Sequence, residues 1–181
     1  MRVIFLLLIF PLFAGCTQEA NDEPSSAEKM KTIREAIAEI CRTDNDTPVF
    51  VTDRPTLQPI LDQLNADLPQ DLIEYLDHCI PTESYGRMVE FHGYETLIEE
   101  NRDYVPGGDT IKQDLLCIAK EGDGSQFAYD VRTGKILHIG QTASETAEKT
   151  REEAWESWGS FIEFLNWYLH DLREVVAEQG A

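Results

Sequence analysis

Three short strands joined by two glycine-containing turns most constrain how this chain can fold. The first turn, at residues 121–125, contains two glycines, and the second, at 132–134, ends in Gly134. Gly134 stands where a three-residue hairpin loop needs a residue in the left-handed conformation. The sequence therefore predicts an antiparallel meander. Its strands are expected at residues 115–119, 126–131 and 135–139.

The middle strand of this meander alternates in polarity. Phe127, Tyr129 and Val131 fall on one face, and Ala128 and Asp130 fall on the other. This period of two is typical of a strand with one buried face. The strand before it is apolar on both faces, which is typical of a strand covered on both sides. We therefore expect the meander at the centre of an α+β domain, in a mostly antiparallel sheet covered by helices.

Amphipathic segments on both sides of the meander predict the helices. Ser25 with Glu28, and Ser160 with Glu163, have the spacing of a capping box before apolar residues that repeat every three or four positions. Pro69 suits the first position of another helix. We expect helices at 25–41, 57–64, 69–79, 94–101 and 160–176, extended segments at 48–52 and 87–92, a loop at 105–109 and a polar, acidic segment at 141–153.

Composition limits the class of protein. The chain has 181 residues, 42% of them hydrophobic and 27% charged, which suits one folded domain with one core, expected at residues 27–181. The formal net charge is −19. Such a charge repels nucleic acid and favours a basic protein as partner. A solvated acidic surface that only keeps the protein soluble is the alternative.

The N-terminus has the pattern of an export signal. Residues 3–13 form an apolar run that is too short to span a bilayer, so residues 1–15 are predicted to be a signal peptide. Phe13-Ala14-Gly15-Cys16 resembles the lipobox of bacterial lipoproteins, although Leu12 stands one place too early. The resemblance implies a lipid on Cys16, and Thr17 after it implies the periplasmic face of the outer membrane. An ordinary secretory peptide is the alternative. Residues 16–26 are then the lipidated cysteine and a polar tether.

Several local strings, in this order, resemble the SMI1/KNR4 family, also called SUKH. The family opens a helix with Leu-Pro and carries an aromatic-Leu pair inside it, as in Leu68-Pro69 and Tyr75-Leu76. An acidic-Asn stretch, a Tyr-Asp strand and a turn into the next strand follow. The closing helix then begins with Ser160-Phe161. The matching strings span about residues 57–172 and include Glu99-Glu100-Asn101, Gly122–Gly124, Tyr129-Asp130 and Thr133-Gly134.

The resemblance implies a function. Bacterial members of the family are regarded as immunity proteins, which bind and neutralise a cognate toxin. An export signal does not fit a cytosolic nuclease inhibitor, so the resemblance implies a toxin met in the envelope. The chain departs from the family at His78-Cys79-Ile80-Pro81, where many members carry an Asn-Gly-Gly turn. This departure predicts a remodelled surface near that turn.

The sequence lacks the local patterns of metal, cofactor and catalytic sites. The four histidines, His78, His92, His138 and His170, are scattered without a zinc-type spacing. The glycine-rich turn at 121–125 lacks the ligands of a calcium loop. The sequence carries no phosphate loop, nucleophile elbow or zinc helix. We therefore predict no metal, no cofactor and no enzymatic activity, although a small hydrolase with a site dispersed in sequence stays an alternative.

Tryptophans and cysteines leave further alternatives open. Trp155, Trp158 and Trp167 lie on or before the last predicted helix, and Trp167 lies off its apolar stripe. An exposed tryptophan could anchor a partner, and packing of all three is the alternative. Cys41, Cys79 and Cys117 allow one disulfide at most, or buried free thiols.

These observations predict a lipid-anchored protein that binds a cognate toxin or another basic protein without catalysis. Its contact with the membrane is expected through the lipid only. A structural or regulatory envelope lipoprotein is the main alternative, and the small hydrolase is the other. Acidic residues before the last helix are the first candidates for the binding face, with a solvated run as the alternative for each. They are Glu145, Glu148, Glu152, Glu153 and Glu156.

Overall fold

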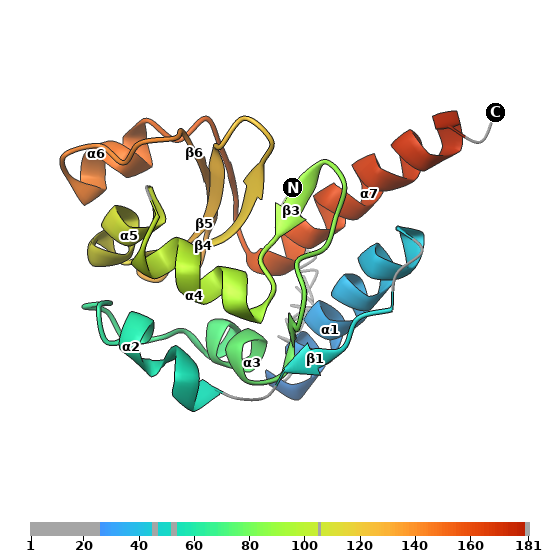
Figure 1. Ribbon diagram of the computed structural model, residues 1–181, viewed down its shortest axis with the longest axis horizontal. Helices are drawn as coiled ribbons and strands as arrows, with labels where there is room; N and C mark the ends of the chain where they lie inside the picture. The colour runs from blue at the N-terminus through green and yellow to red at the C-terminus, as the bar shows by residue number, and fades with distance from the viewer. Residues whose placement is uncertain (1–25, 45–46, 52–53, 105, 180–181) are drawn as a thin grey trace, which may run out of the picture.

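The computed structural model describes residues 26–44, 47–51, 54–104 and 106–179 (Figure 1). The predicted signal peptide, Cys16 and the tether up to residue 25 lie outside this range. Within it, no helix is both long enough and apolar enough to cross a membrane.

The predicted meander forms the centre of a five-stranded antiparallel sheet. The strands follow the order β3-β4-β5-β6-β7, and a separate ladder pairs β1 with β2. The α+β class and the mostly antiparallel sheet are therefore confirmed. The strands are β1 (Phe50–Val51), β2 (Ile80–Pro81), β3 (Val89–Phe91), β4 (Leu115–Glu121), β5 (Gln126–Asp130), β6 (Ile136–Ile139) and β7 (Glu156–Trp158).

Helices lie on both sides of this sheet. Figure 1 shows the long C-terminal helix on one side, with the N-terminal helix packed along it, and the short helices α5 and α6 on the other. The helices are α1 (Ser26–Thr43), α2 (Gln58–Leu61), α3 (Gln70–His78), α4 (Tyr94–Arg102), α5 (Gly107–Thr110), α6 (Ala147–Glu152) and α7 (Phe161–Gln179), with short 3₁₀ turns at Arg54–Leu57 and Ile111–Gln113.

The first face of the sheet, which carries Phe127 and Tyr129, holds most of the core. The Phe127 ring lies 5.0 Å from the Phe164 ring of α7, and Tyr129 lies 6.3 Å from Phe161. Tyr75 of α3 meets Phe161 edge to face at 4.8 Å. All five rings are fully buried. Interlocking aromatic rings therefore join α3 and α7 to the sheet, as the apolar stripe of the last helix predicts.

The start of α7 confirms the predicted Ser160 cap, whereas the Glu163 side chain bonds one residue further back than in a capping box. The backbone N–H of Glu163 donates to the Ser160 hydroxyl at 3.2 Å, and the Glu163 carboxylate accepts from the Gly159 N–H at 2.8 Å. These bonds satisfy donors that have no partner within the helix. The helix therefore begins where the sequence places it.

The second face of the sheet, which carries Leu115, Cys117, Ala128, Leu137 and Ile139, was expected to reach solvent along β5. That expectation is wrong, because every residue of β5 is buried and Asp130 is only 1% exposed. A small apolar cluster covers this face, with Ala154 packed against it. Helices α5 and α6 lie over it (Figure 1). The alternation along β5 thus separates two buried sides that differ in polarity.

Two segments differ from their predicted structure. The expected loop at 105–109 contains α5, because the glycine at 107 permits close packing: a Cβ there would lie 2.2 Å from the Glu100 carbonyl oxygen. The polar segment at 141–153 contains α6, and β7 follows it and pairs with β6. The side chain of Thr146 caps α6 by accepting from the Lys149 N–H. Short polar elements of this kind leave too little periodicity for recognition.

Asn101 completes the edge of β4. Strand β3 pairs with β4 only from Ala119 onward, so Cys117 has no strand partner on that side. The Asn101 amide replaces that partner, because it accepts from the Cys117 N–H at 2.9 Å and donates to the Cys117 carbonyl at 2.8 Å. Cys41, Cys79 and Cys117 are buried thiols that form no disulfide in this structure, which fits the second of the two alternatives.

Candidate functional site

The most prominent exposed aromatic side chain lies between α6 and β7. Trp155 is 59% exposed, whereas Trp158 is buried and Trp167 packs against it at 4.8 Å. The sequence drew attention to Trp167 as the tryptophan off the helix stripe. The structure assigns the exposed position to Trp155, outside the helix. Exposed indoles are rare on monomers and common at the centre of protein interfaces.

Trp155 is held firmly although it is exposed. Its backbone N–H donates to the His138 carbonyl at 2.8 Å. Its indole meets the His138 ring edge to face at 5.0 Å, and that ring stacks on Phe127 at 4.3 Å. The indole is therefore connected to the aromatic core through His138. A fixed aromatic side chain loses little conformational entropy when a partner covers it.

Trp155 lines two separate hollows. One has a volume of about 430 Å³ and is lined by Lys135, Leu137, Arg151 and Glu156 among others. The other has a volume of about 120 Å³, and Glu153 is part of its lining. The indole thus forms a ridge that borders two depressions. A partner of complementary shape can bind over this ridge.

An ion pair fixes α6 against the sheet behind this ridge. The Arg151 guanidinium makes two bonds of 2.9 Å to the Asp130 carboxylate. Burial disfavours the charged carboxylate, but hydrogen bonds from Arg151 and Thr133 outweigh it, so the pKa of Asp130 is lowered. Arg151 also donates to the Gln113 carbonyl at 3.1 Å. The bidentate geometry ties α6, β5 and the turn before β4 together.

A second buried carboxylate, Asp114, holds the loops next to this pair. Asp114 has a left-handed backbone, with φ of 65°, and is fully buried. It accepts from the Asn65 N–H at 2.5 Å and from the Arg132 guanidinium at 2.6 Å. Burial raises its pKa, and these hydrogen bonds lower it further than burial raises it, so the pKa lies below the ordinary value. Asp114 therefore pins the β5–β6 hairpin to the segment before α3.

The five predicted glutamates lie on the segment that contains α6 and Trp155. Glu148 and Glu152 lie on α6, and Glu145 precedes the helix. Glu153 and Glu156 line the two hollows beside Trp155. All five are exposed. Together with Trp155 they form what we call the Trp155 surface, and their role in binding stays a prediction.

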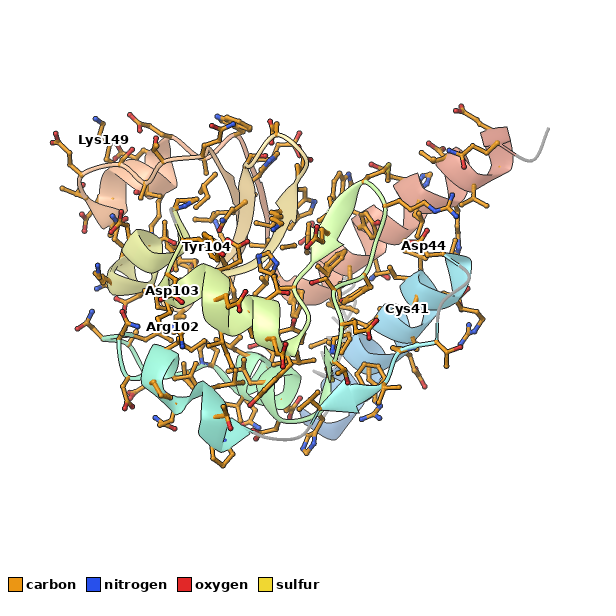
Figure 2. The ribbon with its side chains drawn as sticks, in the orientation of Figure 1. Cys41, Asp44, Arg102, Asp103, Tyr104 and Lys149 are labelled. Carbon is orange, nitrogen blue, oxygen red and sulfur yellow. The ribbon has the colours of Figure 1, made fainter. Side chains whose placement is uncertain are left out.

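Some of this negative charge is offset locally. The Lys149 ammonium, labelled on α6 in Figure 2, lies 3.7 Å from the Glu153 carboxylate, which also accepts from the Ser144 hydroxyl. Such exposed pairs are weak, because water and salt screen them. A basic partner can therefore displace Lys149 at little cost.

Among the described residues, Ser125 and His138 come nearest to a catalytic arrangement. The Ser125 hydroxyl lies 3.0 Å from His138 Nε2, but it donates to the Asp123 carboxylate at 2.7 Å. A serine nucleophile needs a histidine that is oriented by an acid on its other nitrogen. Here both Asp123 and Glu121 lie on the serine side. The prediction of a protein without enzymatic activity is not tested by this geometry.

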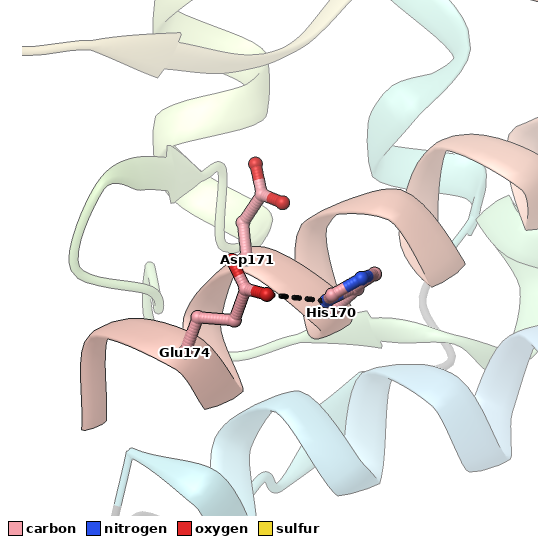
Figure 3. A group of neighbouring side chains, drawn as sticks. All are labelled: His170, Asp171 and Glu174. Carbon is pink, nitrogen blue, oxygen red and sulfur yellow. Dashed lines mark ion pairs between the residues drawn. The ribbon is translucent and has the colours of Figure 1, made fainter. Parts of the chain in front are cut away.

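His170, Asp171 and Glu174 form one group of possible metal ligands on α7 (Figure 3). His170 Nδ1 and a Glu174 carboxylate oxygen are 3.8 Å apart, and both side chains are about 70% exposed, at 71% and 69%. An exposed pair one helical turn apart is common without a metal, so we treat it as a solvated ion pair.

A known protein family matches the chain. The model of the SMI1 / KNR4 family (SUKH-1) matches residues 54–167. This range contains all the strands of the main sheet and begins after α1. Neither a curated protein nor a solved structure matches the chain.

Proposed function

The chain belongs to the SMI1/KNR4 family (SUKH-1), and from this membership we propose that its domain binds and neutralises a cognate toxin without catalysis. Family members commonly act in immunity to toxins. The observation that carries the proposal is the Trp155 surface: a fixed, exposed indole that lines two hollows, each of which also contains a glutamate. Such a surface suits a partner with an apolar recess and a basic rim.

The partner is a basic protein in this proposal. The net charge of −19 attracts a basic protein and repels nucleic acid. Electrostatic steering accelerates association of opposite charges by factors of ~10 to 1000, and salt reduces the effect. Covering the toxin surface then blocks its activity, with no bond made or broken.

We further propose that a lipid on Cys16 holds the domain at the periplasmic face of the outer membrane. This proposal is based on the lipobox-like residues before Cys16 and on the apolar run that precedes them. Intact mass of the membrane form should show two or three acyl chains on an N-terminal Cys16. A mature chain that begins at another residue would contradict the anchor.

The test of the binding function is co-purification with the product of the adjacent gene, followed by stopped-flow association at rising ionic strength. We expect a complex, and an association rate that falls as salt rises. Reversing the five glutamates of the Trp155 surface to lysine should slow association by ~10-fold or more. Absence of a complex, or a rate indifferent to both salt and charge reversal, would contradict the proposal.

A matched control separates local from overall charge. Five other exposed acids lie away from the Trp155 surface: Asp62, Asp67, Glu95, Glu174 and Glu178. Each reversal to lysine changes the charge by two, so either set of five shifts the net charge from −19 to −9. The control set should slow association much less than the set at the Trp155 surface. Equal effects would mean that overall charge alone steers the partner.

A further inference from the structure

A second depression, which we call the Tyr104 pocket, lies where α4 meets β3, β4 and β5. Its volume is about 540 Å³. Figure 2 shows Tyr104 directly after α4, beside Arg102 and Asp103. The Tyr104 ring is 55% exposed at the rim. The residues used in the argument are Glu90, Glu99, Glu100, Tyr104, Lys120 and Gln126.

The charges in this pocket are unbalanced. Among the described residues that line it, Lys120 is the one cation, and its ammonium lies 2.8 Å from the Glu100 carboxylate and 3.8 Å from that of Glu90. The hydrogen bond to Glu100 raises the pKa of Lys120, so the ammonium stays charged. Three glutamates against one lysine leave the pocket with two excess negative charges. A cation is therefore favoured inside it, and an anion is repelled.

A buried acceptor at this site has no donor. Gln126 is 2% exposed, and its Nε2 donates to the Glu100 carboxylate at 3.3 Å. Its Oε1 has no hydrogen-bond partner among the described residues. Exchanging the amide oxygen and nitrogen would place an oxygen against the Glu100 carboxylate, so the orientation is fixed by chemistry. Buried acceptors are normally paired, and this one points to a missing donor.

Arginine fits this combination best among protein side chains. Its guanidinium is always charged, carries five N–H donors and no acceptor, and stacks on aromatic rings. Carboxylates and an amide oxygen supply acceptors in the pocket, and the Tyr104 ring supplies an aromatic wall at the rim. The ammonium of lysine is a compact point charge without a planar array of donors. It therefore binds this set of acceptors and the aromatic ring less well than a guanidinium does.

We propose that the Tyr104 pocket receives an arginine side chain of the protein that the domain binds. The inference rests on the proposed binding function for the source of that arginine. The pocket itself is defined independently by its charge, its unpaired acceptor and its aromatic rim.

The Tyr104 pocket and the Trp155 surface are connected. Gly124 lines the pocket, and a Cβ there would lie 3.5 Å from the Gln141 side chain. The neighbouring Gly140 packs under Trp155, since a Cβ on it would lie 3.5 Å from the indole. Gly140 and Gln141 therefore link the two sites, and one partner can cover both.

Small probes test the pocket without any partner. We would titrate the full chain in detergent micelles with N-acetyl-arginine amide and follow the Gln126 side-chain amide and the Tyr104 ring by NMR. N-acetyl-citrulline amide, which is neutral and of similar shape, and N-acetyl-lysine amide are the matched probes. Saturable shifts at millimolar arginine probe are expected, with at least 5-fold weaker binding of the other two. No saturation, or equal binding of all three, would overturn the proposal.

Variants localise the bound probe. Glu99→Gln and Tyr104→Ala change exposed side chains of the pocket and should weaken binding of the arginine probe at least 3-fold. Glu95→Gln changes an exposed glutamate one turn earlier on the same helix that does not line the pocket, so it should leave binding unchanged. Indifference to the two pocket variants would overturn the proposal. Failure to recover a toxin does not affect this result, so the two proposals fail separately.

A complex with the partner protein tests whether the bound arginine comes from that partner. In a complex with the co-purified protein, Tyr104→Ala should weaken affinity at least 5-fold, and replacing one arginine of the partner should remove that difference. A pocket that binds the free probe but whose variants leave partner affinity unchanged would overturn the assignment of the arginine to the partner.

Discussion

The two faces of the main sheet are both buried, but they are built differently. The first face packs aromatic rings against α7, and its apolar cluster is the larger of the two. On the second face the apolar cluster is small, and buried polar side chains surround it, including Asp114, Gln126 and Asp130. Apolar burial is strong but has no direction, whereas hydrogen-bonded ion pairs fix geometry at little net gain. The first face stabilises the fold, and the second face positions loops.

The proposed binding features lie on or beside the second face. Trp155 follows α6, which the Asp130 ion pair holds, and the Tyr104 pocket contains Gln126 from the same side of β5. A solvent-exposed surface that must keep one shape cannot rely on apolar packing alone. The polar network supplies that shape, and the aromatic core supplies the stability.

Removing a ring from the first face should have the largest effect on stability. Phe164→Ala deletes a fully buried ring that lies 5.0 Å from both Phe127 and Trp158. We expect a loss of ~3 to 5 kcal/mol in the free energy of unfolding, measured by urea denaturation. Leu137→Ala on the second face is the comparison and should cost ~2 kcal/mol, because it lines an open hollow. Equal losses would show that the two faces contribute alike.

Breaking the ion pair on the second face should have the next largest effect. Asp130→Ala leaves Arg151 without its buried partner and should cost ~2 to 3 kcal/mol. This is below the roughly 3 to 5 kcal/mol of a fully buried pair, because the Arg151 side chain is 20% exposed. Lys149→Ala, which removes an exposed pair of the same helix, should cost less than ~0.5 kcal/mol. A small loss for Asp130→Ala would mean that apolar contacts alone hold α6.

His92 should make stability depend on pH. It is fully buried after β3, and burial, with a smaller contribution from the Lys120 charge, lowers its pKa from 6.5 to about 3. Between these values the unfolded chain binds a proton that the folded chain does not, so stability is complete above pH 6.5 and falls as the pH falls towards 3. The loss is ~1.4 kcal/mol per pH unit well below 6.5. His92→Leu should remove this part of the slope in denaturation at pH 7, 6 and 5. An unchanged slope would mean that His92 is protonated in the folded chain.

The meander and the last helix could be predicted because their signals are local. Gly124 and Gly134 adopt φ of 89° and 72°, which residues other than glycine rarely adopt. A single glycine therefore indicates each turn. The segment from 141 to 158 could not be predicted to the same degree. Strand β7 has three residues at a sheet edge and gains its structure from pairing with β6. At 107 a glycine that suggests a loop serves instead for close contact with α4.

The candidate site was predictable only in part. The charge run placed five exposed glutamates around α6, but periodicity singled out Trp167 instead of Trp155. Nothing local distinguishes Trp155, whose exposure follows from the path of the chain between α6 and β7. The Asp130–Arg151 pair joins residues 21 positions apart, and the Tyr104 pocket combines four elements. Such groupings arise from the topology of the sheet, so single-sequence patterns do not contain them.

The affinity of the Trp155 variant for the co-purified partner tests the central claim most directly. Trp155→Ala, measured by calorimetry, should bind at least ~30-fold more weakly, as expected for an interface tryptophan worth ~2 kcal/mol or more, with a nearly unchanged free energy of unfolding. Val49→Ala is the control, because Val49 is 69% exposed outside the Trp155 surface, and its affinity should stay within ~2-fold of the original chain. If Trp155→Ala binds as tightly as the original chain, or if Val49→Ala loses more affinity, the partner does not bind at the Trp155 surface.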